Sequence, residues 1–200
     1  WIRWPSAADL WEDNLGPAQG EVAELIGAIL FPDPADEKGA FVRGERIELL
    51  VRGEEARVAA EAMRLGLADQ AAVRIHEAPI GDVWLRDTGP IFVDEATLGL
   101  NASAFRFNGW GDKYFLPEDD RIADIVAASA GARLRRFHAF VGEGGALEVD
   151  GEGTVITTRQ CLLNKNRNPG MTEKDVEGVL REALGAERVI WLDEGMMGDH

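Results

Sequence analysis

The sequence is poor in residues on which several classes of protein depend. It contains a single cysteine, Cys161, among 200 residues, which excludes an intrachain disulfide framework and a metal site built on several cysteines. A reducing compartment, and hence the cytoplasm, is the default location. No run of residues approaches the roughly 20 apolar positions of a membrane-spanning helix, and no signal peptide is recognisable. Because the chain opens without Met and stops without a tail-like composition, both ends look cut.

Basic residues are scarce as well. The chain has 21 Lys and Arg against 36 Asp and Glu, a formal net charge of −15. Nucleic-acid binding depends on basic side chains that neutralise phosphates, so this balance argues against a nucleic-acid partner. It is compatible with a cationic substrate, although solubility alone would explain it. A composition of 46% hydrophobic and 28% charged residues fits one globular unit. The sequence is compatible with a monomer and with a homo-oligomer.

One short pattern occurs twice. Residues 87–94 read Asp-Thr-Gly-Pro-Ile-Phe-Val-Asp, and residues 143–150, 56 positions later, read Glu-Gly-Gly-Ala-Leu-Glu-Val-Asp. The acid, a glycine, an aliphatic residue and the closing Val-Asp coincide. One further period leads from Glu143 to Asp199, which places a third acid in register. Internal repetition at a fixed spacing is typical of folds that are built from equivalent structural units.

Each copy begins a unit with the order strand, strand, helix, strand. Both copies predict a β-hairpin, followed by a helix that ends at Gly131 or at Gly185 and by a strand at 133–137 or 188–192. Thr172 is expected to cap the second helix. The helix faces predicted to be buried carry Ile122, Ile125, Val126 and Ser129 in the first unit and Val176, Val179, Leu180 and Ala183 in the second.

The pattern is looser upstream, with strands at 47–52 and 72–76 around a helix at 54–65. A further helix begins near Pro17 and carries Val22, Leu25, Ile26 and Ile29 on one face. Repeats of this kind stack openly or close radially. A closed ring is favoured, because its equivalent strand starts converge on one axis. The sequence thus predicts an α+β fold, a β/α propeller of pseudo-symmetric ββαβ repeats in which the repeated acids meet.

Carboxylates that converge need a cationic partner or a proton. A metal is the weaker prediction, because no His or Cys stands at ligand spacing nearby. A planar guanidinium fits better, since its five donors pair bidentately with carboxylates. Trp84 could lie against that plane, although a core tryptophan explains it equally well. Alternatively, residues 84–94 form an apolar strand that is interrupted by an Arg86–Asp87 salt bridge, in which case Asp87 has a structural role and does not bind a cation.

Three segments carry a resemblance to a known family. Residues 84–90 (Trp-Leu-Arg-Asp-Thr-Gly-Pro), residues 105–114 and the run from Glu143 to Pro169 look like the agmatine deiminase and bacterial peptidylarginine deiminase family. The similarity continues in order over nearly all 200 residues. It implies a propeller of five ββαβ repeats, the fold of the guanidine-modifying enzymes, of which residues 1–200 would form about the first three within a single deiminase domain.

The resemblance also implies a reaction. In this family a cysteine thiolate attacks the guanidinium carbon, ammonia leaves, and water hydrolyses the thiouronium adduct to a ureido product. By this resemblance Asp87 would grip the guanidinium, Trp84 would line the pocket and Glu143 would orient the catalytic histidine. Asp199 and His200 would lie near the substrate. The family's catalytic His and Cys would follow residue 200, and no metal or organic cofactor is expected.

Other conspicuous residues are predicted to be structural. Cys161 follows a strand without a patterned His or acid around it, so a packing role is preferred to nucleophilic catalysis. His76 and His138 adjoin strands and are expected to be structural or solvent-exposed. Residues 164–169 read as a turn whose Asn and Arg side chains satisfy backbone groups, in preference to an anion site. Residues 109–111 are expected to shape a loop near the pocket mouth.

The sequence therefore predicts a guanidine deiminase that binds a small cationic guanidine. The preferred reaction is agmatine to N-carbamoylputrescine and ammonia, as in putrescine biosynthesis. A peptidylarginine deiminase, which citrullinates protein, is the alternative within the same chemistry, because only contacts beyond the guanidinium separate the two. A non-catalytic cation-binding propeller is the alternative of another class.

Overall fold

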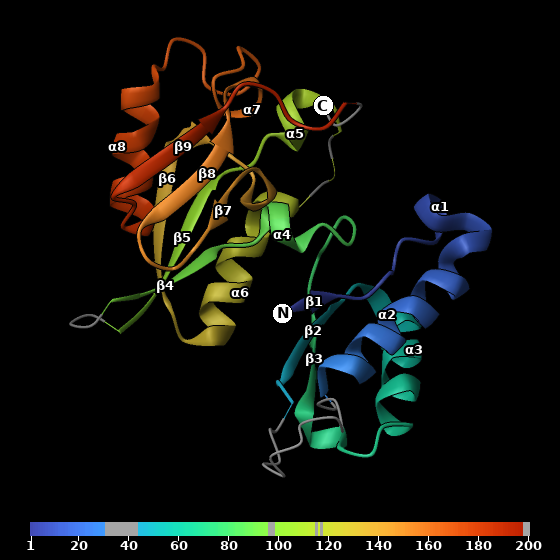
Figure 1. The fold of residues 1–200 in the computed structure, drawn as a ribbon. Helices are drawn as coiled ribbons and strands as arrows, with labels where there is room; N and C mark the ends of the chain where they lie inside the picture. Colours follow the sequence, from blue (N-terminus) through green and yellow to red (C-terminus); the bar gives the residue numbers. More distant parts are fainter. Residues whose placement is uncertain (31–43, 96–98, 115, 117, 198–200) are drawn as a thin grey trace. The chain divides into compact units, whose positions relative to one another are not determined.

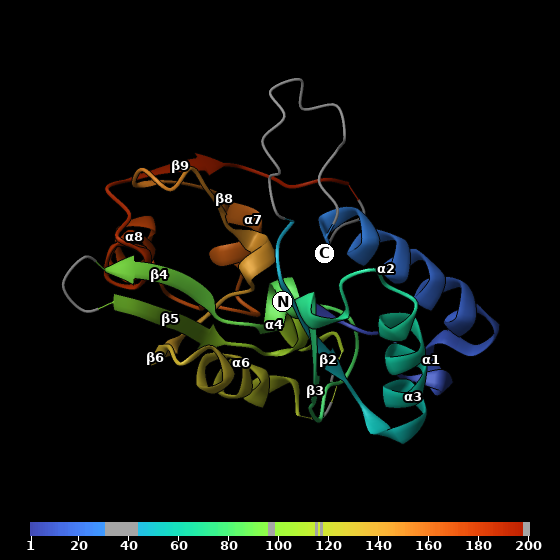
Figure 2. The same ribbon diagram turned by 90° about the horizontal axis from the view of Figure 1, so that it is seen from below.

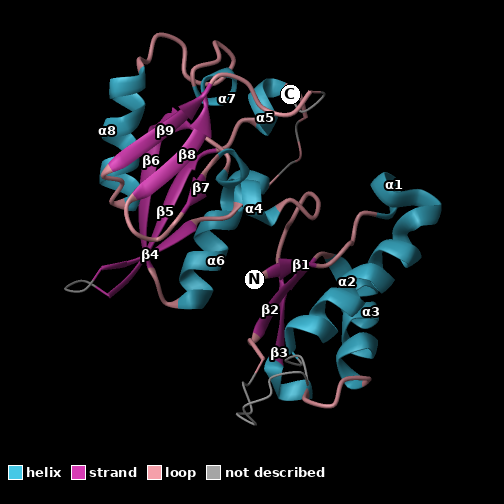
Figure 3. Ribbon diagram, in the orientation of Figure 1, coloured by secondary structure: helices cyan, strands magenta, loops and turns pink. Residues whose placement is uncertain are grey.

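The chain forms two compact units in a computed structural model, which describes residues 1–30, 44–95, 99–114, 116 and 118–197. The first unit is Trp1–Leu85 and the second is Arg86–His200. Both combine helices with three-stranded sheets (Figures 1 and 3). Within the described ranges, no helix is long and apolar enough to cross a membrane.

The first unit is a parallel sheet with two helices on one face (Figures 1 and 2). Strands β1 (Ile2–Arg3), β2 (Ile47–Val51) and β3 (Val73–Glu77) lie in that order, and both pairs are parallel. Helices α2 (Leu15–Leu30) and α3 (Gly53–Leu65) provide the crossovers. The sequence predicted both helices and the strands β2 and β3. The short elements of this unit are α1 (Ala8–Trp11), η1 (Glu12–Asn14) and η2 (Gln70–Ala72).

The core of the first unit joins alternate strand positions to one stripe on each helix. Its buried residues are Trp4, Ile26, Leu30, Ile47, Leu49, Val51, Ala56, Ala60 and Val73. Leu25 was predicted on the buried face of α2, but its side chain is 52% exposed. That prediction was wrong, because the buried stripe runs through Val22, Ile26 and Leu30, which leaves Leu25 at its margin.

The second unit contains the two predicted ββαβ repeats. In the first repeat, β4 (Ile91–Glu95), β5 (Gly99–Arg106) and β6 (Arg133–Val141) form a sheet in that order, with α6 (Ile122–Ala130) between β5 and β6 in the chain. The β4–β5 pair is antiparallel and the β5–β6 pair is parallel. β6 extends four residues beyond the strand predicted at 133–137, up to Val141.

The second repeat has the same order and the same strand directions. β7 (Glu148–Val149) pairs antiparallel with β8 (Thr154–Thr158), which pairs in parallel with β9 (Arg188–Leu192). Helix α8 (Glu173–Leu184) connects β8 to β9. The matching topology confirms the ββαβ repeat and places residues 87 and 143 at equivalent points, just before each hairpin.

Local chemistry explains where these elements end. Both long helices of the second unit stop at a glycine in the left-handed region, Gly131 at φ 65° and Gly185 at φ 71°. The β7–β8 turn is closed by Asp150, whose Oδ1 accepts the backbone N–H groups of Glu152 at 2.8 Å and Thr154 at 2.9 Å. The Thr154 hydroxyl, followed by the two backbone N–H groups, holds the pKa of Asp150 below its ordinary value.

Helix packing joins the two repeats. The hydroxyl of Ser103 on β5 donates to the carbonyl of Ala183 on α8 at 2.6 Å, so α8 contacts the sheet of the other repeat. The shared core contains Phe140, Leu147, Val155, Leu162, Val176, Leu180 and Ala186. On α6, Ile122 and Val126 are buried as predicted. Ser129 is exposed, and the stripe is completed by Ala123 and Ala127 instead.

Helix α8 begins with a capping box that makes its stability depend on pH. Thr172 and Asp175 exchange hydrogen bonds, and the Thr172 hydroxyl and backbone N–H lower the pKa of the Asp175 carboxyl. A lowered folded-state pKa stabilises the fold above the unfolded value of about 3.9. We therefore expect Asp175→Asn to unfold at lower urea concentration than wild type at pH 7. The difference should close as the pH falls below about 4, and a difference independent of pH would contradict this account.

Five short elements lie at the strand ends of the second unit or, for α4, where it begins. They are α4 (Leu85–Thr88), α5 (Gly109–Asp112), η3 (Asp119–Arg121), η4 (Gly144–Ala146) and α7 (Arg159–Leu162). The prediction of a strand interrupted at Arg86 and Asp87 was wrong, because these residues form the helical turn α4 before the strand begins at Ile91.

Candidate functional site

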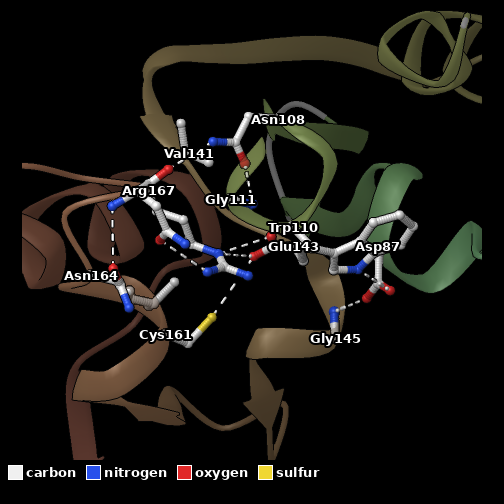
Figure 4. A network of polar contacts seen from close by, with 12 residues as sticks. Asp87, Asn108, Trp110, Gly111, Val141, Glu143, Gly145, Cys161, Asn164 and Arg167 are labelled. Atoms are coloured by element: carbon white, nitrogen blue, oxygen red, sulfur yellow. Dashed lines mark hydrogen bonds and ion pairs between the residues drawn. The ribbon is translucent and has the colours of Figure 1, made fainter. Parts of the chain in front are cut away.

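The second unit contains a cavity of about 390 Å³. Asp87 and Glu143 both line it, although 56 residues separate them in the chain. Arg167 is the third charged residue of the lining, and Trp110 and Cys161 also contribute (Figure 4). The repeat predicted that the two acids meet, and the structure brings them to one cavity. Their roles in binding or catalysis stay predictions.

Asp87 is held by two donors from different segments. Its Oδ2 accepts the indole N–H of Trp110 at 3.1 Å, and its Oδ1 accepts the backbone N–H of Gly145 at 3.0 Å (Figure 4). Arg86 donates instead to the carbonyl of Leu147 at 2.7 Å. The simple Arg86–Asp87 pair is therefore not what fixes this carboxylate.

The loop that carries Trp110 has an unusual backbone. Four consecutive residues have positive φ, with Gly109 at 69°, Trp110 at 59°, Gly111 at 79° and Asp112 at 64°. A bulky residue in the left-handed region is strained. The Oδ1 of Asn108 accepts the N–H of Gly111 at 2.9 Å and stabilises the turn. Sequence reasoning assigned this loop only a shaping role and missed the contact with Asp87, although the flanking glycines were a signal.

Glu143 forms a buried ion pair with Arg167. The Arg167 Nε donates to Oε1 at 2.9 Å and to Oε2 at 3.0 Å. The two side chains are only 4% and 5% exposed, respectively. Because each charge would be costly to bury alone, the pair is a unit whose partners depend on one another.

The turn at residues 164–168 only partly follows its prediction. Asn168 satisfies backbone groups as expected: its Oδ1 accepts the N–H of Val141, and its Nδ2 donates to the carbonyls of Val141 and Leu162 at 2.8 and 2.9 Å. Arg167 does not follow it, because its guanidinium binds the Glu143 carboxylate. The sequence offered only one hint, a charged residue between two asparagines.

Cys161 has two environments. The residue is half-buried and packs against the shared core, which is the role predicted for it. Its Sγ also donates to the Oε2 of Glu143 at 3.8 Å and contributes to the cavity wall. The second contact was not expected from the sequence.

Two glycines allow the second repeat to approach Asp87. A Cβ on Gly144 would lie 2.1 Å from the carbonyl oxygen of Arg86, and one on Gly145 would lie 2.2 Å from the Oδ1 of Asp87. Real Cβ atoms do not approach other atoms so closely. The Gly144–Gly145 pair is therefore a packing requirement of the site.

Replacement of Gly145 should displace Asp87. If the cavity binds the guanidinium ligand that the sequence predicts, Gly145→Ala in the full-length protein should weaken that binding by roughly 10- to 100-fold, because the carboxylate must move by an ångström or more. Gly178→Ala on α8 is the matched control, since a Cβ there meets nothing within 4 Å. Titration calorimetry should find the control unchanged, and equal affinities in both variants would refute the requirement.

The remaining predicted residues are not placed at this cavity. Trp84 belongs to the other unit, where its side chain is 51% exposed. Asp199 and His200 lie outside the described residues. His76 contacts Glu48 and stacks on Trp1, with ring centroids 5.3 Å apart. Among the described residues, no three His, Cys, Asp or Glu side chains gather as a metal site would require.

The arrangement can hold a small cation. Asp87, Glu143 and Arg167 give the lining one net negative charge, and Arg167 already neutralises Glu143. Trp110 and Gly145 use two of the roughly four lone-pair positions of Asp87. This carboxylate can therefore accept further donors, including a planar guanidinium. Fold and site together define a ββαβ-repeat protein with a fixed carboxylate in a cavity that three charged side chains line.

Comparison with known proteins identifies the family. Residues 1–200 match the model of Porphyromonas-type peptidyl-arginine deiminases, and the chain belongs to this family. It is 36% identical over 204 residues to the agmatine deiminase of Stutzerimonas stutzeri and 35% identical to that of Ectopseudomonas mendocina. All of this chain and 51% of each relative are covered. The chain thus spans about half the length of these curated relatives.

A solved structure supports the same assignment. The agmatine deiminase of Enterococcus faecalis superposes with a TM-score of 0.79 at 29% identity, over 98% of this chain and 50% of that one. The predicted α+β propeller of ββαβ repeats is therefore confirmed as the fold class.

Proposed function

We propose that the full-length protein is a guanidine deiminase that converts agmatine to N-carbamoylputrescine and ammonia. The observation that carries the proposal is the cavity in which Asp87 and the Glu143–Arg167 pair meet. A carboxylate fixed by two donors is suited to a flat cation that stays charged at any ordinary pH. The names of the relatives, agmatine deiminases at 32–36% identity, favour agmatine as that cation.

The roles follow from the chemistry that a guanidinium requires. Its carbon is a weak electrophile because resonance spreads the charge, so hydrolysis needs a strong nucleophile and a rigidly held substrate. The Asp87 carboxylate binds the guanidinium of the substrate and keeps it in place. The attacking thiolate and the proton donor belong to segments that the family resemblance places beyond residue 200. Cys161 is not proposed as the nucleophile, because its sulfur faces the carboxylate of Glu143, which disfavours a thiolate.

Substrate choice tests the proposal. The full-length protein should release ammonia from agmatine faster than from free arginine or from a peptide with blocked ends that contains arginine. A preference for the peptide would establish peptidylarginine deimination instead. Release from none of the three, combined with calorimetric binding of agmatine, would leave a cation-binding propeller without catalysis.

A cytoplasmic location is part of the same proposal. The single cysteine, which suits a reducing compartment, supports it. The proposed partner is the small guanidine substrate, and neither a nucleic acid nor a membrane is proposed as a partner. Fractionation of the source cells would test the location, and recovery of the protein in an extracellular fraction would contradict it.

A further inference from the structure

Arg167 is buried beside the proposed substrate site but is unsuited to bind the substrate. Its guanidinium carries the same charge as the proposed ligand, so the two repel one another. Its Nε is already committed to both oxygens of Glu143, and one terminal nitrogen, Nη1, donates to the Oδ1 of Asn166 at 3.3 Å. The arrangement suits a residue that orients other groups.

Glu143 is equally unsuited to grip a substrate guanidinium. Its side chain is 4% exposed, and each carboxylate oxygen accepts a hydrogen bond from Arg167. A bidentate pair with a second guanidinium would need both oxygens on one open edge. Glu143 therefore presents a charge whose orientation is set by Arg167, whereas Asp87 is the carboxylate with acceptor positions left for a ligand.

The turn that carries Arg167 is also connected to Asp87, through the loop that carries Trp110. The carbonyl of Asn166 accepts the Nδ2 of Asn108 at 2.9 Å, and the Asn166 side chain lies directly against Gly111, where a Cβ would be 2.2 Å from its Nδ2. Asn108 and Gly111 flank Trp110, which donates to Asp87. One turn thus supports both carboxylates.

The contacts close into a ring around the cavity (Figure 4). Glu143 is two residues before Gly145, whose N–H binds Asp87. Asp87 binds Trp110, the Trp110 loop contacts the turn, and the turn returns through Arg167 to Glu143. Asn168 is 3% exposed and donates to the carbonyls of Val141 at the end of β6 and Leu162 at the end of α7, which fixes the turn to the protein core. A ring of this kind sets the relative position of the two carboxylates.

We infer that Arg167 is a positioning residue of the deiminase site, which acts through Glu143, and that Asn108 performs the equivalent task for Asp87 through the Trp110 loop. The inference rests on the proposed function. The two connections of the turn should affect different kinetic constants. Asp87 holds the substrate, so Asn108, which positions Asp87, should affect KM. Glu143 does not hold the substrate, so Arg167, which positions Glu143, should affect kcat.

The test compares single and double variants of the full-length protein with agmatine as substrate. Arg167→Met should lower kcat by about 10²-fold, the usual effect of misplacing a catalytic group by an ångström. Its KM should change less than threefold, because the donors to Asp87 remain. Arg167→Lys, which keeps the charge, should recover part of the loss. Asn108→Ala, which removes two hydrogen bonds, should instead raise KM by about tenfold.

Coupling distinguishes positioning from a general loss of structure. If Arg167 acts through Glu143, the double variant Arg167→Met/Glu143→Gln should be no slower than Glu143→Gln alone. Arg136→Met is the matched control, since Arg136 pairs with Asp124 on α6 and is not part of the cavity lining. It should leave kcat unchanged.

Two failures can be told apart. An active wild type in which the losses of Arg167→Met and Glu143→Gln multiply, or in which Arg167→Met keeps its kcat, overturns the inference and leaves the proposed function standing. A wild type that releases no ammonia from any of the three guanidines overturns the proposed function, and the inference with it.

Discussion

Asp87→Asn should lower kcat/KM for agmatine by about 10²- to 10³-fold in the full-length protein. The loss corresponds to about 3–4 kcal/mol, which is within the range expected when one partner of a desolvated charge pair is removed. The substitution also conflicts with the local donors. Both oxygens of Asp87 accept hydrogen bonds, from Trp110 and Gly145, whereas asparagine offers one acceptor. Its amide N–H₂ must therefore face one of these donors.

The control for Asp87 is available in the same repeat. Asp94 closes the pattern that Asp87 opens, and its side chain is exposed on β4. Steady-state kinetics should find Asp94→Asn within about twofold of wild type, as expected for a surface substitution. Equal losses in the two variants would mean that general acidity, and not the fixed carboxylate, attracts the substrate.

Glu143→Gln should destabilise the fold as well as impair the reaction. The substitution leaves the Arg167 guanidinium buried at 5% exposure without its counter-charge. Loss of one partner from such a pair costs about 3–5 kcal/mol of unfolding free energy. Urea unfolding of the second unit, followed by tryptophan fluorescence, should therefore shift to a lower midpoint.

Glu148→Gln is the matched control for this effect. Glu148 lies 3.9 Å from Arg86, and both side chains are largely exposed, so its loss should change the unfolding free energy by less than about 1 kcal/mol. An unfolding midpoint for Glu143→Gln equal to that of the Glu148→Gln control would show that the buried pair is unimportant for stability.

The repeat could be predicted from the sequence because each of its signals is local. Each signal fixes the conformation of only a few neighbouring residues. These signals are the hairpin turn at residues 150–153, the Thr172 cap and the glycines that end both helices. Their order then gave the ββαβ unit, and the 56-residue offset placed Asp87 and Glu143 at equivalent points. Pseudo-symmetry supplied long-range information that no local signal carries, and it sufficed to predict that the two acids meet.

The partners of those acids could not be predicted in the same way. Arg167 lies 24 residues from Glu143, and Trp110 lies 23 from Asp87, in the loops that connect the second strand of each repeat to its helix. Local sequence explains a turn or a loop without saying what its side chain touches. Leu25 and Ser129 were mispredicted for a similar reason. Helical spacing indicates which face of a helix is buried, but it does not indicate how wide the buried face is, and both residues are exposed.

A crystal structure of the full-length Glu143→Gln variant soaked with agmatine tests the central claim most directly, because slowed turnover should let the substrate accumulate. The account predicts guanidinium nitrogen atoms about 3 Å from the oxygens of Asp87, inside the cavity that Trp110 and Arg167 also line. Agmatine bound elsewhere, with Asp87 still contacting only Trp110 and Gly145, would contradict it.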